Sequence, residues 1–228
     1  MDQAFQIAGE SGPFQKMIII IVSLVSLLVT IYSLCFSYLT KRPEFLCRDK
    51  SIPDSKFQEC QYHIDLCDSN IEMKKDPLRS VRNWSYDYDL YCSRDYYNDL
   101  ISTAFFLGGI SGSLSLSSIP DKYGRKNIFK VLLVLSCILH LNLMLASGPI
   151  HMMILFYFGG FFSFAFGMTF FIVTEYLPLS ITGTVMGVLN ALYPAGGILI
   201  GFFFLYINNW RLLFGTSYYL LFNIKVFY

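Results

Sequence analysis

Five residues in the second half of the chain have the types needed for an ion pair that can form and break. Asp121, Gly124, Arg125 and Lys126 lie close together, and Glu175 is the only acidic side chain that follows them. Glycine permits a tight backbone turn, aspartate can interact with cations or a helix N-terminus, and arginine offers a fork for a carboxylate. We expect Glu175 to pair with Arg125 or Lys126, so that the five residues form a latch. A plain basic turn and an interfacial glutamate solvated by headgroups are the simpler alternatives.

The composition indicates where such a latch lies. Hydrophobic residues make up 54% of the 228 residues, aromatic residues 18% and charged residues only 14%, with a net charge of +1. These proportions fall outside those of soluble globular chains and predict an integral protein of the lipid bilayer. The near-zero net charge gives no reason to expect nucleic acid as a partner.

Long uncharged stretches predict an all-α membrane protein with six spans, because one span needs about 20 apolar residues. The expected spans are 17–40, 100–120, 131–147, 151–174, 184–206 and an incomplete sixth, 212–228. Gly108, Gly109 and Gly112 in the second span favour close helix approach. Pro194 is expected to bend the fifth span.

Orientation follows from the positive charges of the short loops, which are retained in the cytoplasm. The 121–130 loop carries Lys122, Arg125, Lys126 and Lys130. We therefore place this loop and the N-terminal segment, 1–16, inside. The long hydrophilic segment, 41–99, then lies outside.

Four cysteines in the 41–99 segment fit an oxidising compartment. They are Cys47, Cys60, Cys67 and Cys92, an even set that predicts two disulfides with three possible pairings. Asn83-Trp84-Ser85 is an acceptor sequence for N-glycosylation at Asn83.

A rival interpretation makes Cys60, His63 and Cys67 ligands of a zinc ion, since cysteine and histidine at short spacing can bind zinc. We favour the disulfides, and expect no metal and no cofactor. Cys35 and Cys137 fall in predicted spans, where packing is the expected role.

The latch segment resembles the loop signature of the major facilitator superfamily, Gly-x-x-x-Asp-Arg-x-Gly-Arg-Arg. This chain reads Ser117-x-x-x-Asp121-Lys122-Tyr123-Gly124-Arg125-Lys126. Within the superfamily it is similar to organic cation, carnitine and organic anion transporters. Three further motifs carry that resemblance: Gly9-Glu10-x-Gly12-Pro13-Phe14-Gln15-Lys16, Thr174-Glu175-Tyr176 and Asn209-Trp210-Arg211-x-Leu213. Ser117 replaces the family's glycine, and Thr182 and Gly183 stand where a basic residue is usual.

The resemblance implies transport of small organic ions or other small solutes by alternating access, at the plasma membrane. Such carriers bind substrate near the midplane between two six-helix halves. This chain matches the first half and ends at Tyr228, before the Pro-Glu-Ser-Pro-Arg signature expected after span six. We therefore expect a fragment, an incomplete gene model or an isoform. Its partner is the missing C-terminal half or, as an alternative, a second copy.

Aromatic and polar residues in the spans are candidates for the substrate site, because they hold organic ions by cation–π contacts and hydrogen bonds. They are Tyr32, Phe36, Tyr157, Ser163, Asn190 and Tyr193. Helix packing and interfacial placement are the alternative roles for each of them.

Two other classes of function remain. An enzyme is not expected, because His140 and His151 have no acidic partner in the apolar stretches that contain them. A non-transporting half-length membrane scaffold or regulator is the alternative to a carrier.

Overall fold

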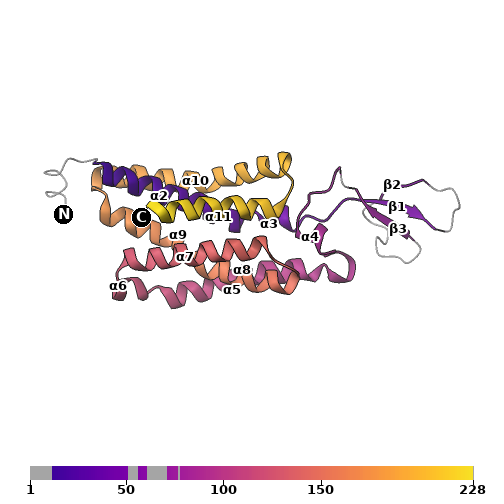
Figure 1. Ribbon diagram of the computed structural model, residues 1–228, viewed down its shortest axis with the longest axis horizontal. Helices are drawn as coiled ribbons and strands as arrows, with labels where there is room; N and C mark the ends of the chain where they lie inside the picture. The colour runs from indigo at the N-terminus through magenta and orange to yellow at the C-terminus, as the bar shows by residue number, and fades with distance from the viewer. Residues whose placement is uncertain (1–11, 51–55, 61–70, 77, 228) are drawn as a thin grey trace.

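The computed structural model describes residues 12–50, 56–60, 71–76 and 78–227, which form a bundle of helices and a small sheet (Figure 1). The long helices are α2 (Pro13–Leu34), α5 (Tyr96–Leu116), α7 (Arg125–Met144), α8 (Pro149–Phe162), α9 (Phe164–Tyr176), α10 (Leu179–Tyr206) and α11 (Trp210–Phe227). The short ones are α3 (Phe36–Leu39), α4 (Trp84–Asp87), α6 (Ile119–Tyr123) and the 3-10 turn η1 (Cys92–Arg94). Strands β1 (Phe45–Asp49), β2 (Gln58–Glu59) and β3 (Ile71–Lys75) form an antiparallel sheet in the order β2-β1-β3.

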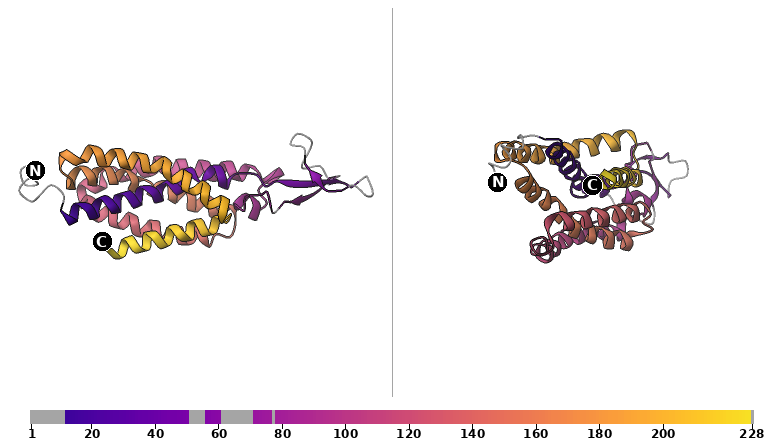
Figure 2. Two further views of the ribbon diagram at one scale, coloured as in Figure 1. Left: turned by 90° about the horizontal axis from the view of Figure 1, so that it is seen from above. Right: turned by 60° about the vertical axis from the view of Figure 1, so that its left-hand side comes forward.

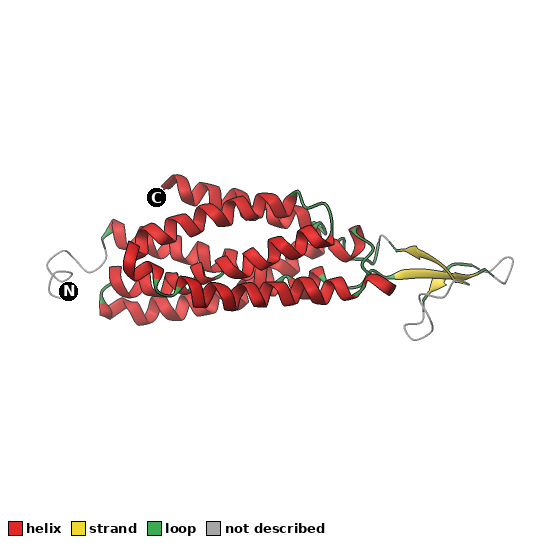
Figure 3. Ribbon diagram, turned by 90° about the horizontal axis from the view of Figure 1, so that it is seen from below, coloured by secondary structure: helices red, strands yellow, loops and turns green. Residues whose placement is uncertain are grey.

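The long helices run along the long axis of the molecule, and the sheet projects from one end of the bundle (Figures 1 and 3). We call this the sheet end. The start of α2, the end of α11 and all of α6 lie at the opposite end, which we call the turn end (Figures 1 and 2). The predicted latch and the cysteine-bearing segment therefore occupy opposite ends of the bundle.

Three described helices, α5, α7 and α10, are long and apolar enough to cross a bilayer. Shorter apolar helices cover Pro13–Leu27 and Pro149–Phe162. Prolines help to start several helices, because proline in the first turn removes a backbone donor that would have no partner. Pro13 and Pro149 have this position in α2 and α8.

Several helices have bounds that differ from those of the predicted spans and loop. Segment 121–130 is mostly helical, because α7 begins at Arg125. The predicted span 151–174 is two helices that meet at Ser163, and span 17–40 is two helices that meet at Cys35. Hydropathy locates apolar runs, whereas a helix continues into polar sequence wherever its backbone hydrogen bonds continue.

Helices α5 and α8 approach each other so closely that backbone meets backbone. A Cβ atom on Gly108 would lie 1.9 Å from the carbonyl oxygen of Tyr157, and one on Gly160 would lie 1.9 Å from that of Phe105. Gly112 repeats the contact against Phe161, at 2.4 Å. The predicted close approach at Gly108 and Gly112 is confirmed.

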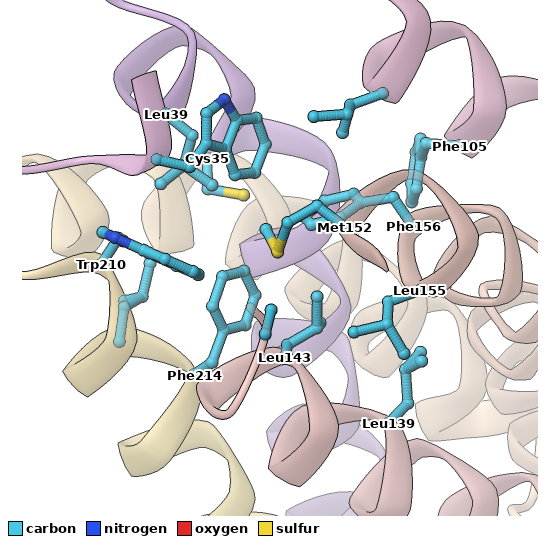
Figure 4. Close-up of a cluster of buried hydrophobic side chains, with 14 of the residues drawn as sticks. Cys35, Leu39, Phe105, Leu139, Leu143, Met152, Leu155, Phe156, Trp210 and Phe214 are labelled. Atoms are coloured by element: carbon cyan, nitrogen blue, oxygen red, sulfur yellow. The ribbon is translucent and has the colours of Figure 1, made fainter. Parts of the chain in front are cut away.

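One of the two hydrophobic cores, which we call the aromatic core, combines buried aromatic rings with leucine, methionine and cysteine side chains (Figure 4). Trp84, Phe156, Trp210 and Phe214 are fully buried there, and their rings meet edge to face. Such contacts add about 0.5–1.5 kcal/mol per pair beyond the burial of area. Trp84 belongs to α4, so the hydrophilic segment inserts a side chain into the bundle.

The two cysteines predicted to pack inside the bundle do so. Cys35 is fully buried in the aromatic core, and Cys137 is buried in the second core, which lies among α2, α7, α9 and α10. Neither of the two is part of a disulfide.

One disulfide joins Cys47 of β1 to Cys60 beside β2. The zinc interpretation is therefore wrong for Cys60, because its sulfur is bonded to another cysteine. Cys92 is also disulfide-bonded. His63 and Cys67 lie outside the described residues.

The prediction of a glycan on Asn83 is wrong for this fold. Asn83 is fully buried, and its Nδ2 atom donates to the carbonyl oxygens of Tyr38 and Lys41 at 2.7 and 2.8 Å. Its Oδ1 atom accepts from the backbone N–H of Tyr86 and caps α4. A glycan on Nδ2 would replace one of its two hydrogens and remove one of these hydrogen bonds, at a site that is fully buried.

Replacing Gly108 with alanine should destabilise the chain by about 1–3 kcal/mol, because the added methyl group overlaps a backbone carbonyl. Gly109→Ala is the matched control, since its Cβ would lie 3.9 Å from the nearest atom. Thermal unfolding in detergent measures both. Equal unfolding temperatures would contradict the backbone contact.

Asn83→Asp should cost about 1–3 kcal/mol, because a carboxylate can cap α4 but cannot donate to the two carbonyls. The exposed Asn127 provides the control, Asn127→Asp. Thermal unfolding reports the difference between the two variants. Peptide N-glycosidase should leave the electrophoretic mobility of the native chain unchanged, and a downward shift that Asn83→Asp abolishes would show a glycan there.

Candidate functional site

The turn between α6 and α7 consists of one residue, Gly124. Its φ of 85° and ψ of 130° lie in a region that residues with a Cβ atom rarely adopt. Because the two helices are joined so tightly, the end of α6 sets the position of the first residue of α7, Arg125.

Arg125 contacts three other groups at the turn end. Its Nη1 atom lies 2.9 Å from Oε1 of Glu175 at the end of α9, which confirms the predicted pair. Its Nη2 atom donates to Oδ1 of Asp121, one turn earlier, at 3.3 Å. Its guanidinium carbon lies 4.9 Å from the ring centre of Phe171, one turn before Glu175. Lys126 is exposed beside this cluster.

The strength of the Arg125–Glu175 pair follows from its exposure. The side chains are 29% and 42% exposed, so water screens the attraction and the pair contributes about 1 kcal/mol or less. Asp121 is 71% exposed and contributes less still. Breaking such a contact costs little free energy.

The candidate substrate residues do not form one cluster. Phe36 packs edge to face against Trp84, Phe105 and Phe156. Its ring is partly buried against the aromatic core, which favours helix packing, the alternative role, over a substrate contact. The side chain of Tyr32 lies outside the described residues.

Tyr157 and Ser163 lie on the α8 side of the bundle. The hydroxyl group of Tyr157 is 3.0 Å from Oγ of Ser111 on α5, and its side chain is partly exposed. Ser163 lies at the junction of α8 and α9, where its hydroxyl donates to the carbonyl oxygen of Gly160.

Asn190 and Tyr193 lie on α10, which packs on α2 rather than α8. Asn190 is exposed, and its side chain donates to the carbonyl oxygen of Met186 one turn earlier. Tyr193 is half-buried. Gly196, one turn later, lies against Thr30 of α2.

The two histidines make local contacts. His140 is buried, with Nδ1 2.7 Å from the carbonyl oxygen of Ser136. Nδ1 of His151 lies 3.5 Å from Oγ of Ser147. Among the described residues, no three histidines, cysteines or acidic side chains are grouped to hold a metal ion.

A second charged cluster at the sheet end was not assigned from the sequence. The indole N–H of Trp210 donates to Oδ2 of Asp87 at 2.9 Å. Arg211 donates to the carbonyl oxygen of Met144 and to the hydroxyl of Tyr88. Burial raises the pKa of Tyr88. The Asn209-Trp210-Arg211 motif was the sequence signal for this cluster, but the motif does not identify the residues that Trp210 and Arg211 contact.

Asn208 adds to this cluster. Its Oδ1 atom accepts from the backbone N–H of Arg82 and its Nδ2 atom donates to the carbonyl oxygen of Ser80. Residues 80–91, which we call the strap, are thus bound to the α10–α11 turn and to the end of α7.

The chain is similar in sequence to transporters of a known family. Residues 90–223 match the family model of the Major Facilitator Superfamily. The chain is 24% identical over 164 residues to an organic cation transporter-like protein of Drosophila melanogaster, covering 59% of the chain and 29% of the relative. It is 26% identical over 168 residues to organic cation/carnitine transporter 2 of Mus musculus, with 56% and 30% covered.

A third relative aligns with most of the chain. Solute carrier family 22 member 15-like of Xenopus tropicalis is 26% identical over 217 residues, which cover 93% of the chain and 42% of the relative. The chain thus spans less than half the length of each of these relatives. Because the family model matches more than half of the chain, the protein belongs to the Major Facilitator Superfamily, and within it is similar to organic cation transporters.

Proposed function

We propose that this chain is the first half of a carrier that moves small organic ions across the plasma membrane by alternating access. The observation that carries the proposal is the Arg125–Glu175 pair beside the Gly124 turn. A partly exposed ion pair within the facilitator signature supports a contact that forms and breaks during transport. The names of the relatives support organic cations as the substrate class.

The two ends of the bundle support one orientation. Lys122, Lys126 and Lys130 lie at or near the turn end, as expected of a cytoplasmic surface. The Cys47–Cys60 disulfide lies at the sheet end, as expected of an oxidising exterior. In this proposal the sheet faces outward.

The latch gives the transport cycle a reversible contact at the cytoplasmic end. Arg125 begins α7 and Glu175 ends α9, so breaking their ion pair lets the two helix ends separate. A contribution of about 1 kcal/mol changes the ratio of two conformations about fivefold. The latch thus changes the ratio of the two conformations without fixing the carrier in one of them.

Helix breaks support a substrate site beside Ser163. The α8–α9 junction lies within the apolar part of the bundle, and interrupted spans often form substrate sites in transporters. Tyr157 lies in α8, less than two turns before the junction. We propose that its ring contacts an organic cation and that Asn190 and Tyr193 approach from α10.

The whole proposal is tested with the longest open reading frame that contains residues 1–228. Cells that express it should take up tetraethylammonium or carnitine faster than vector controls. Surface expression without uptake of either compound would favour the non-transporting scaffold.

In that full carrier, Arg125→Glu should lower the maximal uptake rate at least about fivefold, because it replaces the ion pair with repulsion. Glu175→Arg alone should do the same. The double variant, Arg125→Glu with Glu175→Arg, should recover much of the rate. Initial uptake rates, corrected for surface protein, provide the measurement.

Lys122→Glu is the control for the latch experiment, since Lys122 is an exposed basic residue next to Asp121. It changes charge by the same amount but leaves the Arg125–Glu175 pair intact. A double variant no better than the single ones, or a Lys122 variant just as impaired, would rule out a specific latch.

Tyr157→Ala should raise the KM for an organic cation about 2-fold to 30-fold, the range expected for one cation–π contact. Tyr157→Phe keeps the ring and should change KM little. Tyr206, which is 80% exposed at the end of α10, provides a control aromatic residue, Tyr206→Ala. Concentration-dependent uptake separates KM from the maximal rate, and an unchanged KM in Tyr157→Ala would remove this residue from the site.

A further inference from the structure

Lys75, the last residue of β3, has its ammonium group enclosed by the strap. The side chain is only 23% exposed and forms an ion pair with Oδ1 of Asp89. Its Nζ atom donates to the carbonyl oxygen of Tyr86. It also lies 4.5 Å from the ring centre of Tyr86 and 5.7 Å from that of Tyr91.

These groups supply what an ammonium ion needs when it leaves water. A carboxylate balances the charge, a carbonyl accepts one N–H, and two ring faces attract the cation within about 6 Å. The hydroxyl of Tyr91 donates to Oδ1 of Asp89 at 3.2 Å, which orients the carboxylate. Burial and the Asp89 charge raise the pKa of Tyr91, so this hydroxyl keeps its proton.

The walls of the enclosure are fixed independently of Lys75. The neighbouring strap residue Tyr88 donates to the carbonyl oxygen of Ala146 and accepts from Arg211. Trp84, which precedes Tyr86, and Leu90, which lies between Asp89 and Tyr91, are both buried. Asp89 has a φ of 54°, an unusual conformation for a residue other than glycine, which costs about 1–3 kcal/mol.

Lys75 itself comes from a different element. Its strand belongs to the sheet, which projects away from the bundle (Figure 1), whereas Tyr86, Asp89 and Tyr91 belong to the strap. The ammonium group can therefore leave without unfolding the walls that surround it. Because the surrounding residues belong to the strap and Lys75 belongs to β3, a free ammonium ion can take the place of the Lys75 ammonium group.

We propose that Tyr86, Asp89 and Tyr91 form a binding site for a protonated primary amine, which Lys75 occupies in this structure and from which a free alkylammonium ion displaces it. The hydrogen bond to the Tyr86 carbonyl excludes a quaternary ammonium ion, which has no N–H to donate, and the primary ammonium group of Lys75 sets the size that the site accepts. The site lies at the sheet end and is independent of the proposed transport route.

The first test uses Lys75→Ala in the purified 228-residue chain. The truncation removes three carbons and the ammonium group, which propylammonium replaces in size and charge. Lys75→Ala should lower the unfolding temperature, and propylammonium should restore most of the loss. Sodium chloride at matched ionic strength, 1-propanol and tetramethylammonium should not.

Two variants serve as controls. Lys75→Met keeps a long side chain in the enclosure without its charge, so propylammonium should not restore its stability. Asp89→Asn combined with Lys75→Ala removes the carboxylate and should abolish the rescue. Rescue of Lys75→Met, equal rescue by tetramethylammonium, or no rescue of Lys75→Ala would each overturn the proposal.

The second test examines exchange in the unmodified chain. Propylammonium should increase deuterium uptake several-fold in a peptide that covers residues 71–76, because displaced Lys75 no longer ties β3 to the strap. The same peptide in Lys75→Met should not respond. Unchanged uptake in the unmodified chain would show that Lys75 is a permanent structural contact, and would overturn displacement.

Discussion

The exclusion of charge from the apolar middle of the bundle organises the whole molecule. Between residues 131 and 210 the only acidic or basic side chain, histidines aside, is Glu175. A charge in hydrocarbon costs several kcal/mol, so Glu175 lies where α9 ends and meets Arg125 there. Among the described residues, Asp121 also pairs with Arg125 at the turn end, and the other ion pairs lie at the sheet end, including those of Asp87 with Arg82 and Arg211. The helices between the two ends are held by packing and backbone hydrogen bonds.

The polar contacts at the two ends differ in how deeply they are buried. At the sheet end the strap inserts the buried Trp84 among aromatic rings, and Asp87 accepts from the buried Trp210. Removing a partner from such a buried contact costs about 1–3 kcal/mol. At the turn end, one half-exposed ion pair spans α7 and α9. Breaking the polar contact between α7 and α9 therefore costs less free energy than breaking the one between Asp87 and Trp210.

Glycines and helix breaks decide which parts of the bundle move together. The carbonyl contacts at Gly108 and Gly160 lock α5 to α8 at backbone distance, and so dense an interface has few alternative arrangements. The junction at Ser163 separates α8 from α9. Glu175 lies near the end of α9 and Ser163 lies just before its start, so one short helix connects the latch to this junction. The proposed substrate residue Tyr157 lies on the fixed side of that junction.

The sequence by itself determined the apolar segments, the charged turn and the disulfide-bearing segment, because these depend on the composition of neighbouring residues. It also limited the partners of Glu175 to two basic side chains. Only the tertiary structure selected Arg125 and added Phe171 beneath it. It likewise buried Asn83, packed Phe36 against the core and enclosed Lys75. These outcomes depend on contacts between side chains from segments far apart in the chain. A local sequence pattern does not show which distant segments pack together.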